Sequence, residues 1–290
     1  MRVLTLGRSL LLGTLLLGGV AATVSAQDDM PAGVTLEVFA NGIATAVPAD
    51  ADQILLTELT MVADSALPLE PGALRVSLVA VRAGALSGSL DKSIEIGRAD
   101  AAPGQTEEAS AGTDFTLETG DSALIPAGAV GELQAGNNLV SVLMLSAAPG
   151  ASDDGNANET PQGVTLTPLA AGDTPDLEEG ALFWLGQFTL QPGATFPGQA
   201  QPGAELGAGT AGEFTMKTTG GPGFVVLRDF TTSVIAGKEP AVAEETSGDT
   251  VTFGAGDAVY FPDGNTVDIS NEGSTDAITL FGGVGPLPAE

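Results

Sequence analysis

Short apolar stretches, separated by Gly, Pro and Asp, follow one another along most of the chain. In several stretches apolar and polar residues alternate, which is typical of a strand with one buried face. Others are apolar throughout, as strands covered on both faces are. No segment beyond the first 26 residues keeps a helical period with end caps for three turns. The pattern therefore predicts an all-β protein, with strands at residues 54–62, 74–81, 139–145, 182–190, 224–230, 251–253, 258–261 and 277–281.

The order of these signals occurs twice. Residues 31–36 (PAGVTL) recur as residues 161–166 (PQGVTL). A repeat of this length indicates a duplicated domain rather than a solenoid. Small polar residues fill the stretch between the copies, which reads as an exposed linker. We expect one domain at residues 27–147, the linker at 148–162 and a second domain at 163–290.

Each copy also contains a Pro-Gly turn followed by a Gly-Asp turn. The sequence pairs Pro71-Gly72 with Pro192-Gly193, and Gly120-Asp121 with Gly256-Asp257. Glycine accepts positive φ in such turns, and aspartate bonds nearby backbone N–H groups. The two turns are 48 residues apart in the first copy and 63 in the second, which predicts a larger loop there.

The N-terminus reads as a signal peptide of 26 residues. Arg2 and Arg8 supply positive charge, residues 9–22 form an apolar run, and residues 24–26 (VSA) suit a signal peptidase. The alternative is an uncleaved membrane anchor, for which the apolar run is marginal in length. We expect cleavage after residue 26 and an extracytoplasmic protein, secreted or periplasmic, with no membrane association afterwards.

Charge and composition exclude several classes of function. Loss of residues 1–26 would leave 7 basic against 37 acidic residues, a net charge of −30. Such a field repels nucleic acid and anionic lipid. The chain has no cysteine and no histidine, so thiol chemistry and a Ser-His-Asp triad are excluded. Stability must come from apolar cores, because no disulfide can form.

Two spaced sets of residues stand out in the second copy. The sets are Gly193, Gln199, Gln201, Glu205, Gly212 and Gly256, Pro262, Gly264, Val267, Asn271. The spacing resembles the two motifs of the cupin family, G-x5-H-x-H-x3-E-x6-G and G-x5-P-x-G-x2-H-x3-N. The resemblance implies two cupin-like β-barrel (jelly-roll) domains in tandem, an arrangement called a bicupin. All three motif histidines are replaced, by Gln199, Gln201 and Val267.

The first copy resembles the same family in a more eroded form. Its second motif keeps Gly120, Pro126 and Gly128. Its first motif keeps only Gly72. The residues that fall on the other motif positions are Gly131 for a histidine, Ala135 for the asparagine, Leu78 and Ala80 for two histidines, and Gly84 for the glutamate.

In the family, the histidines and the glutamate hold a divalent transition metal inside the barrel. Imidazole suits these ions, whereas a glutamine carbonyl is a weak donor and Val267 is no ligand. Three oxygens from Gln199, Gln201 and Glu205 fall short of the six to eight that Ca²⁺ takes. We therefore expect no bound metal and no cofactor.

The resemblance places Gln199, Gln201, Glu205 and Val267 at the barrel cavity, where we expect a small polar ligand. The alternative is structural, with the two glutamine amides satisfying the Glu205 carboxylate. Tyr260 and Trp184 lie in apolar stretches and are expected to be core residues.

The linker mimics a calcium loop only in part. Asp154, Asn156 and Asn158 match its opening, but Glu159 replaces the required glycine and Thr165 the final glutamate. A solvated linker is the better interpretation. Residues 158–160 form a glycosylation sequon that only a glycosylating host would use.

These observations favour an exported bicupin-like binding or structural module without a catalytic metal and with no catalytic residue assigned. The alternative is a metal-independent cupin isomerase or lyase that uses Glu205 as base on a small polar substrate. A third hypothesis is a cell-surface packing protein whose acidic exterior takes up cations. Association into a homo-oligomer, or packing of one barrel on the other, is expected from the resemblance.

Overall fold

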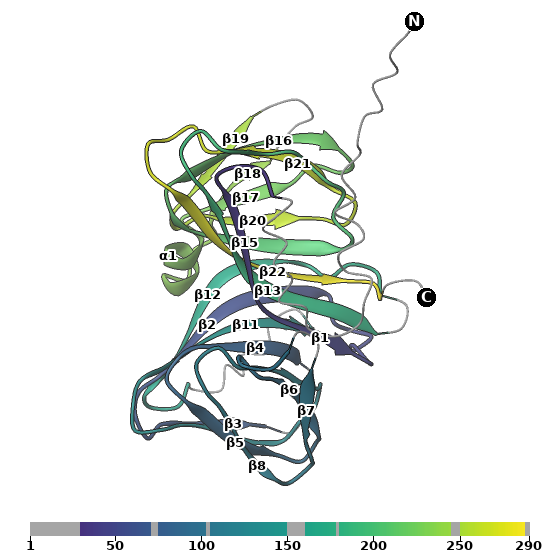
Figure 1. Ribbon diagram of the computed structural model, residues 1–290, viewed down its shortest axis with the longest axis vertical. Helices are drawn as coiled ribbons and strands as arrows, with labels where there is room; N and C mark the ends of the chain where they lie inside the picture. Colours follow the sequence, from purple (N-terminus) through teal and green to yellow (C-terminus); the bar gives the residue numbers. More distant parts are fainter. Residues whose placement is uncertain are drawn as a thin grey trace, which may run out of the picture.

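The computed structural model describes residues 30–70, 75–102, 105–149, 160–177, 180–244 and 250–287. The predicted signal peptide, Pro71-Gly72 and residues 150–159 of the predicted linker lie outside the described residues. Strands make up nearly all of the regular structure, which confirms the predicted all-β class (Figure 1). No helix within these ranges has both the length and the apolar composition to span a membrane.

Barrel 1 consists of a large and a small antiparallel sheet. The large sheet runs in the order β12 (Val164–Asp173), β2 (Gln53–Met61), β11 (Val140–Ala148), β4 (Val76–Ala83), β9 (Ser122–Ile125), β6 (Ile94–Gly97) and β7 (Thr106–Ala109). The small sheet runs in the order β3 (Ala66–Leu69), β10 (Gly131–Ala135), β5 (Leu86–Leu90) and β8 (Asp114–Leu117).

Barrel 2 repeats this design. Its large sheet has the order β1 (Val34–Ala44), β13 (Ala181–Leu190), β22 (Ala277–Gly285), β15 (Ala204–Ala211), β20 (Ala258–Phe261), β17 (Val225–Arg228) and β18 (Ala241–Glu244). Its small sheet has the order β14 (Thr195–Phe196), β21 (Thr266–Ser270), β16 (Glu213–Gly220) and β19 (Val251–Gly254). A short helix, α1 (Phe230–Ile235), connects β17 to β18.

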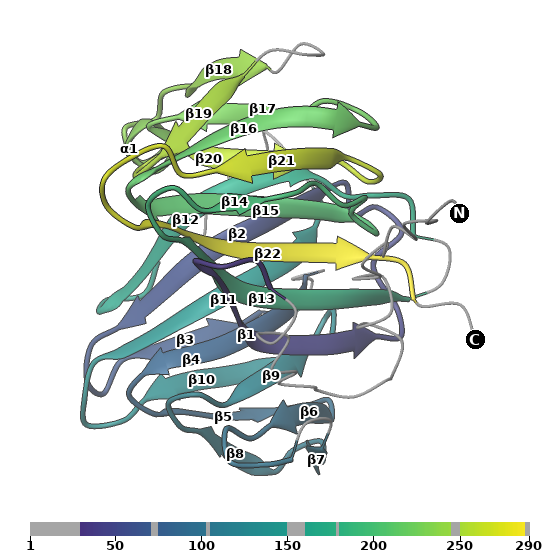
Figure 2. The same cartoon turned by 45° about the horizontal axis from the view of Figure 1, so that its top comes forward.

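The two repeats exchange their first strands. Strand β1 pairs with β13 of barrel 2, and β12 pairs with β2 of barrel 1 (Figures 1 and 2). Both exchanged strands contain a bulge at the same relative place, after Val38 in β1 and after Pro168 in β12. Each barrel is therefore completed by a strand from the other half of the chain.

The two large sheets pack face to face, with the small sheets outside them. Residues of both large sheets, such as Leu78, Leu145, Phe183 and Leu206, form the core between the barrels. Alternate residues of the same strands face the barrel interiors; Val79 and Val81 of β4 belong to the core of barrel 1. Covering on both faces explains why β4 is apolar without alternation.

Strand register fixes which residues of the two repeats correspond. Pro126 and Pro262 each follow a strand whose last residue pairs with the neighbouring strand: Ile125 with Ser77, and Phe261 with Glu205. Ser77 is therefore the counterpart of Glu205, and the prediction that Gly84 takes the glutamate position is wrong. Gly84 instead matches Gly212, since both have positive φ (80° and 63°).

The same comparison corrects the predicted pairing of the Pro-Gly turns. The N–H of Ala194 donates to the oxygen of Gln191 (3.0 Å), as that of Ser65 does to Val62 (3.1 Å). Within these turns Gly193 has φ 77° and Asp64 has φ 62°. Asp64 thus takes the place of Gly193, because aspartate tolerates the left-handed conformation. Composition alone favours Pro71-Gly72, because Pro-Gly is the more familiar turn pair.

Candidate functional site

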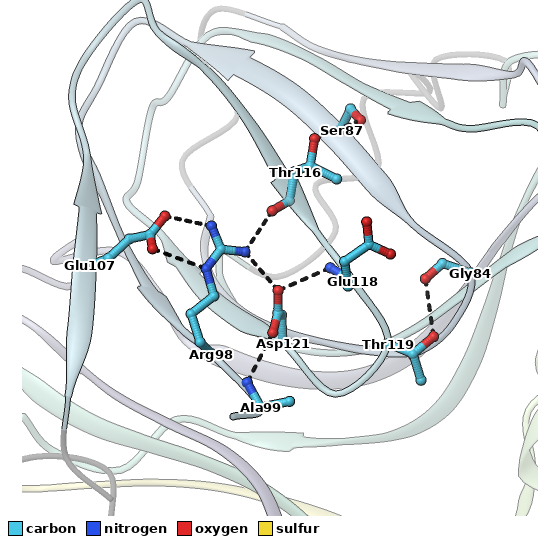
Figure 3. A network of polar contacts seen from close by, with 9 residues as sticks. All are labelled: Gly84, Ser87, Arg98, Ala99, Glu107, Thr116, Glu118, Thr119 and Asp121. Atoms are coloured by element: carbon cyan, nitrogen blue, oxygen red, sulfur yellow. Dashed lines mark hydrogen bonds and ion pairs between the residues drawn. The ribbon is translucent and has the colours of Figure 1, made fainter. Parts of the chain in front are cut away.

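Both Gly-Asp turns are held by an arginine. Asp121 accepts from the N–H groups of Ala99 (2.9 Å) and Glu118 (3.0 Å) and from Arg98 Nη1 (2.7 Å), as Figure 3 shows. Asp257 has the corresponding partners Asp229, Gly254 and Arg228. The prediction that these aspartates bond nearby backbone N–H groups is confirmed. The turns are scaffold in both barrels.

The barrel 1 turn has one further charge. Arg98 also forms an ion pair with Glu107, whose side chain is exposed (Figure 3). Burial raises the pKa of Asp121, but the N–H groups of Ala99 and Glu118 together with Arg98 outweigh this effect, and its pKa lies below the usual value. The hydrogen bonds that Arg98 donates to Glu107 raise the pKa of Arg98, so the network stays fully charged at neutral pH.

The motif asparagine is likewise structural. Asn271 Nδ2 donates to the oxygens of Leu190 (2.7 Å) and Thr275 (2.8 Å), and its Oδ1 accepts from the N–H of Gly273 (2.9 Å). The side chain is buried. In barrel 1 the backbone N–H of Ala135 donates to Ser65 O, as that of Asn271 donates to Ala194 O. Alanine has no side-chain amide with which to form the other bonds of Asn271.

Glu205 faces the interior of barrel 2. Its neighbours in β15, Ala204 and Leu206, belong to the core between the barrels, so alternation turns Glu205 the other way. Burial raises the pKa of Glu205 to about 7, against a smaller opposing effect of the hydrogen bond from Trp184. A carboxyl of this pKa exchanges a proton near neutral pH.

Trp184 is the residue that sequence reasoning missed. It is packed against the core of barrel 2, as predicted, but its Nε1 also donates to Glu205 Oε2 (3.1 Å). The ring covers Gly283, where a Cβ would lie 2.1 Å from it. Trp184 pairs with Gly283, which pairs with Glu205, so the three are side by side in the sheet. Only this register, invisible in the sequence, joins the indole to the carboxyl.

Barrel 1 has a different pair at this point. Ser77 Oγ and Ser146 Oγ are 2.8 Å apart, and both residues are buried. Ser146 pairs with Ser77 as Gly283 pairs with Glu205. One hydroxyl donates to the other, so this interior pair in barrel 1 is hydrogen-bonded and carries no charge.

Gln199 and Gln201 lie in the loop between β14 and β15, half-buried. Gln201 exchanges backbone hydrogen bonds with the 264–265 turn: its N–H donates to Asn265 O (3.0 Å), and its oxygen accepts from Gly264 N (3.1 Å). Among the described residues, no hydrogen bond joins either glutamine side chain to Glu205. The hydrogen-bond partner that the structure gives the Glu205 carboxyl is Trp184.

Two further polar atoms at this end of barrel 2 have no partner. Val267 and Ile269 of β21 pack in or against the core of barrel 2. Asn265 lies in the turn directly before β21, and its Nδ2 donates to the backbone oxygen of Pro222. Asn265 is 1% exposed, and its Oδ1 accepts no hydrogen bond from any described residue. Thr218 pairs with Val267 across the small sheet, and its buried Oγ1 is also unpaired within the described chain.

The chain at residues 201–205 runs from the turn before β21 to the large sheet of barrel 2. Gln201 donates its N–H to the backbone oxygen of Asn265, next to the small sheet. Gly203 then lies close to the large sheet: a Cβ added to it would be 2.3 Å from the backbone oxygen of Val284. Glu205 is the first inward residue after this crossing. We group the bonded pair Trp184 and Glu205 with the unpaired oxygens of Thr218 and Asn265 under the name barrel 2 polar end.

These residues do not fit a transition metal. Val267 is a core residue, and Glu205 is already bonded to an indole N–H. No cluster of three or more acidic side chains suited to a metal occurs in the described ranges. Asn and Thr oxygens are donors for hard cations or hydroxyl groups, not for the ions that imidazole binds.

Comparisons with known proteins were made at three levels. No family model matches the chain, and no curated protein matches it in sequence. Among solved structures, oxalate decarboxylase from Lactobacillus farciminis in complex with formate is 12% identical, with 86% of this chain and 82% of that one covered and a TM-score of 0.46. Oxalate decarboxylase from Bacillus subtilis is 11% identical, with 89% and 74% covered and a TM-score of 0.41. Likeness at this level says nothing of activity, so function is argued from the residues of this chain.

Proposed function

We propose that this protein is an exported, metal-free binding module of cupin-like architecture, and that the barrel 2 polar end takes a small polar ligand. The observation behind the proposal is the pair of buried, unpartnered oxygens, Asn265 Oδ1 and Thr218 Oγ1. Buried polar atoms are normally hydrogen-bonded, by protein or by something bound. A ligand that donates hydrogen bonds would satisfy both.

The chemistry of the site favours an uncharged ligand with hydroxyl groups, such as a sugar or polyol. Asn265 Oδ1 accepts only, while a threonine hydroxyl both donates and accepts. An ion would need a countercharge in a buried site, and Glu205 is half protonated near pH 7. The indole of Trp184 adds an apolar face beside the polar groups, the usual composition of such sites.

The proposal is tested with a panel of sugars and polyols, by thermal shift and then calorimetry on the full chain. Thr218→Val removes the hydroxyl at nearly constant shape and should weaken binding by about tenfold or more, because one satisfied hydrogen bond is worth about 1 to 1.5 kcal/mol. Ser77→Ala, in the neutral interior of barrel 1, is the matched control and should leave affinity unchanged. Equal affinity of Thr218→Val and the unaltered chain would contradict the proposal.

The second candidate, a metal-independent isomerase or lyase, is favoured by one observation. Glu205 has its pKa near 7, where a general base is most effective. A Glu205→Gln variant should then keep ligand affinity but lose turnover of the bound compound. Full turnover by that variant would exclude Glu205 as the base.

Export rests on the sequence of residues 1–26 alone. N-terminal sequencing of the protein made in its own host should begin at Gln27. A chain that still begins at Met1 and sediments with membranes would favour the anchor.

A further inference from the structure

A hollow of about 270 Å³ lies between the two large sheets, where the core between the barrels ends. Strands β2, β4 and β11 of barrel 1 and strands β13, β15 and β22 of barrel 2 contribute to it (Figure 1). We call it the inter-barrel hollow; its lining residues are Glu58, Arg82, Ser141, Leu143, Gln187, Thr210 and Leu280. None of them belongs to the barrel 2 polar end.

Strand register shows that the hollow is built from equivalent positions of the two repeats. Leu143 pairs with Glu58 in barrel 1, and Leu280 pairs with Gln187 in barrel 2. The two leucines occupy the same place in β11 and β22, so Glu58 and Gln187 correspond as well. The hollow therefore lies where the two halves of the molecule face each other with like positions.

A third equivalent pair lies in two bulges. Arg82 is the residue of β4 that has no partner in β11, and Thr210 is the residue of β15 that has no partner in β22. Bulges redirect a side chain out of the regular alternation and are frequent beside functional sites. Here both bulges bring a polar residue into the lining of the hollow.

The two barrels give the hollow different chemistry. Barrel 1 supplies two opposite charges, Arg82 and Glu58, whereas barrel 2 has a neutral amide and a hydroxyl at the equivalent places, Gln187 and Thr210. One leucine from each barrel adds an apolar surface. A cation, an anion and an apolar surface are thus present in one small space.

The Arg82 guanidinium is available to a ligand. It stacks on Phe39, 3.6 Å from the ring centroid, and forms no hydrogen bond or ion pair with any residue that the structure describes. Burial lowers the pKa of Arg82, against the opposing charges of Glu37 and Glu58, which lie beyond ion-pair distance. The arginines of the two Gly-Asp turns, by contrast, are bonded to their aspartates.

Glu58 supplies the acceptor on the other side. Its Oε1 accepts a hydrogen bond from Ser141 Oγ (3.1 Å), which leaves the second carboxylate oxygen for a ligand. The side-chain amide of Gln187 has no hydrogen-bond partner within the described ranges and adds a neutral donor and acceptor.

We infer that the inter-barrel hollow binds a small zwitterionic α-amino acid with an apolar side chain. The carboxylate of the ligand pairs with Arg82 in the bidentate geometry that guanidinium favours, and its ammonium group pairs with Glu58. Its side chain lies against Leu143 and Leu280. The net charge of the chain, −28, disfavours a free anion, whereas a zwitterion adds no net charge.

The probe is L-leucine, titrated into the full chain by isothermal calorimetry, and saturable binding is expected. Two analogues each lack one charge: leucinamide has no carboxylate, and N-acetyl-leucine has no ammonium group. Each should bind at least about tenfold more weakly, because hydrogen bonds to charged groups are the stronger ones. This comparison uses the unaltered chain and so does not depend on the folding of any variant.

Two variants locate the site. Arg82→Met and Glu58→Gln should each weaken leucine binding at least about tenfold. In Arg82→Met the difference in affinity between leucine and leucinamide should also shrink, since the partner of the carboxylate is gone. Arg75→Met removes an exposed arginine of the same barrel that does not line the hollow; it is the matched control and should leave affinity unchanged.

Three results would overturn the inference. The first is the absence of saturable leucine binding up to about 1 mM. The second is equal affinity for leucine and both analogues. The third is leucine binding that Arg82→Met and Glu58→Gln both leave unchanged. None of these results bears on the barrel 2 polar end, which is tested separately with Thr218→Val.

Discussion

The two barrels share their scaffold and differ in what they bury at one interior point. Barrel 1 places Ser77 against Ser146, and barrel 2 places Glu205 against Trp184. The Gly-Asp turns, by contrast, are built alike in both. Ala129 in barrel 1 stands where barrel 2 has Asn265, since each donates its N–H to the proline three residues earlier. Turn geometry is therefore common to the repeats, whereas the interior pair differs: two hydroxyls in barrel 1, and a carboxyl with an indole in barrel 2.

Removing the asparagine clamp should have the largest effect. Asn271→Ala makes barrel 2 resemble barrel 1, where Ala135 occupies the position, but it leaves two buried carbonyls and an N–H without their partner. We expect a loss of about 3 kcal/mol in the free energy of unfolding, at about 1 kcal/mol per hydrogen bond. Urea denaturation measures it. A loss below about 1 kcal/mol would show that the clamp is dispensable.

The pH dependence of stability should separate the two interior pairs. The pKa of Glu205 is raised from 4.5 to about 7 on folding, so the folded state binds its proton more tightly. This contribution is fully present below pH 4.5, declines as pH rises to 7 and is lost above it. Its size is about 3 kcal/mol at most, from 1.36 kcal/mol per pKa unit.

The measurement is the difference in unfolding free energy between the unaltered chain and Glu205→Gln from pH 4.5 to 8. The unaltered chain should lose stability relative to the variant across this range. Ser77→Ala, which has no titrating group, should run parallel to the unaltered chain. A Glu205→Gln difference that does not change with pH would mean that the carboxyl has an ordinary pKa.

The next largest loss of unfolding free energy is expected from changing Asp121, the aspartate of the barrel 1 turn. Asp121→Asn removes a buried carboxylate that holds Arg98 and two N–H groups, and should cost about 2 kcal/mol. Because the pKa of Asp121 is lowered, its contribution is present above its unfolded value of 3.8 and is lost as pH falls further. Glu107→Gln, at the exposed end of the same network, should cost no more than about 0.5 kcal/mol. If Asp121→Asn and Glu107→Gln cost the same, Asp121 would stabilise the protein through the charge of Arg98 and not through its bonds to the turn.

The serine pair should have a smaller effect than Asp121→Asn. Ser77→Ala leaves Ser146 without its hydrogen bond and should destabilise by about 1 kcal/mol. Changing both serines to alanine should cost less than twice that, because no unpaired hydroxyl then remains. Denaturant titration of the two variants gives the coupling. An additive result would mean that the hydroxyls do not interact.

Local composition was enough to predict some of these features. Apolar runs and turn residues predicted the strands and the Gly-Asp turns, since each depends on neighbours in the chain. Pairings across the sheets were not predictable. Asp64 occupies the position in barrel 1 that Gly193 occupies in barrel 2, and Ser77, not Gly84, occupies the position of Glu205. Trp184 and Glu205 are neighbours only because both strands pair with β22.

The strand exchange was also beyond the sequence. Residues 31–36 and 161–166 are so similar that each suits either sheet, and nothing local states which barrel a strand completes. Likewise, the unpaired oxygens of Asn265 and Thr218 arise from three-dimensional packing. The motif directed attention to Glu205 but gave no reason to include them.

A crystal structure of the natively purified protein, with anomalous data for metals, tests the central claim most directly. The account predicts an ordered water or a small hydroxylated molecule bonded to Asn265 Oδ1 and Thr218 Oγ1, with Glu205 bonded to Trp184 and no transition metal beside it. A metal ion on Glu205, or both oxygens paired with protein groups and no space left between them, would contradict it.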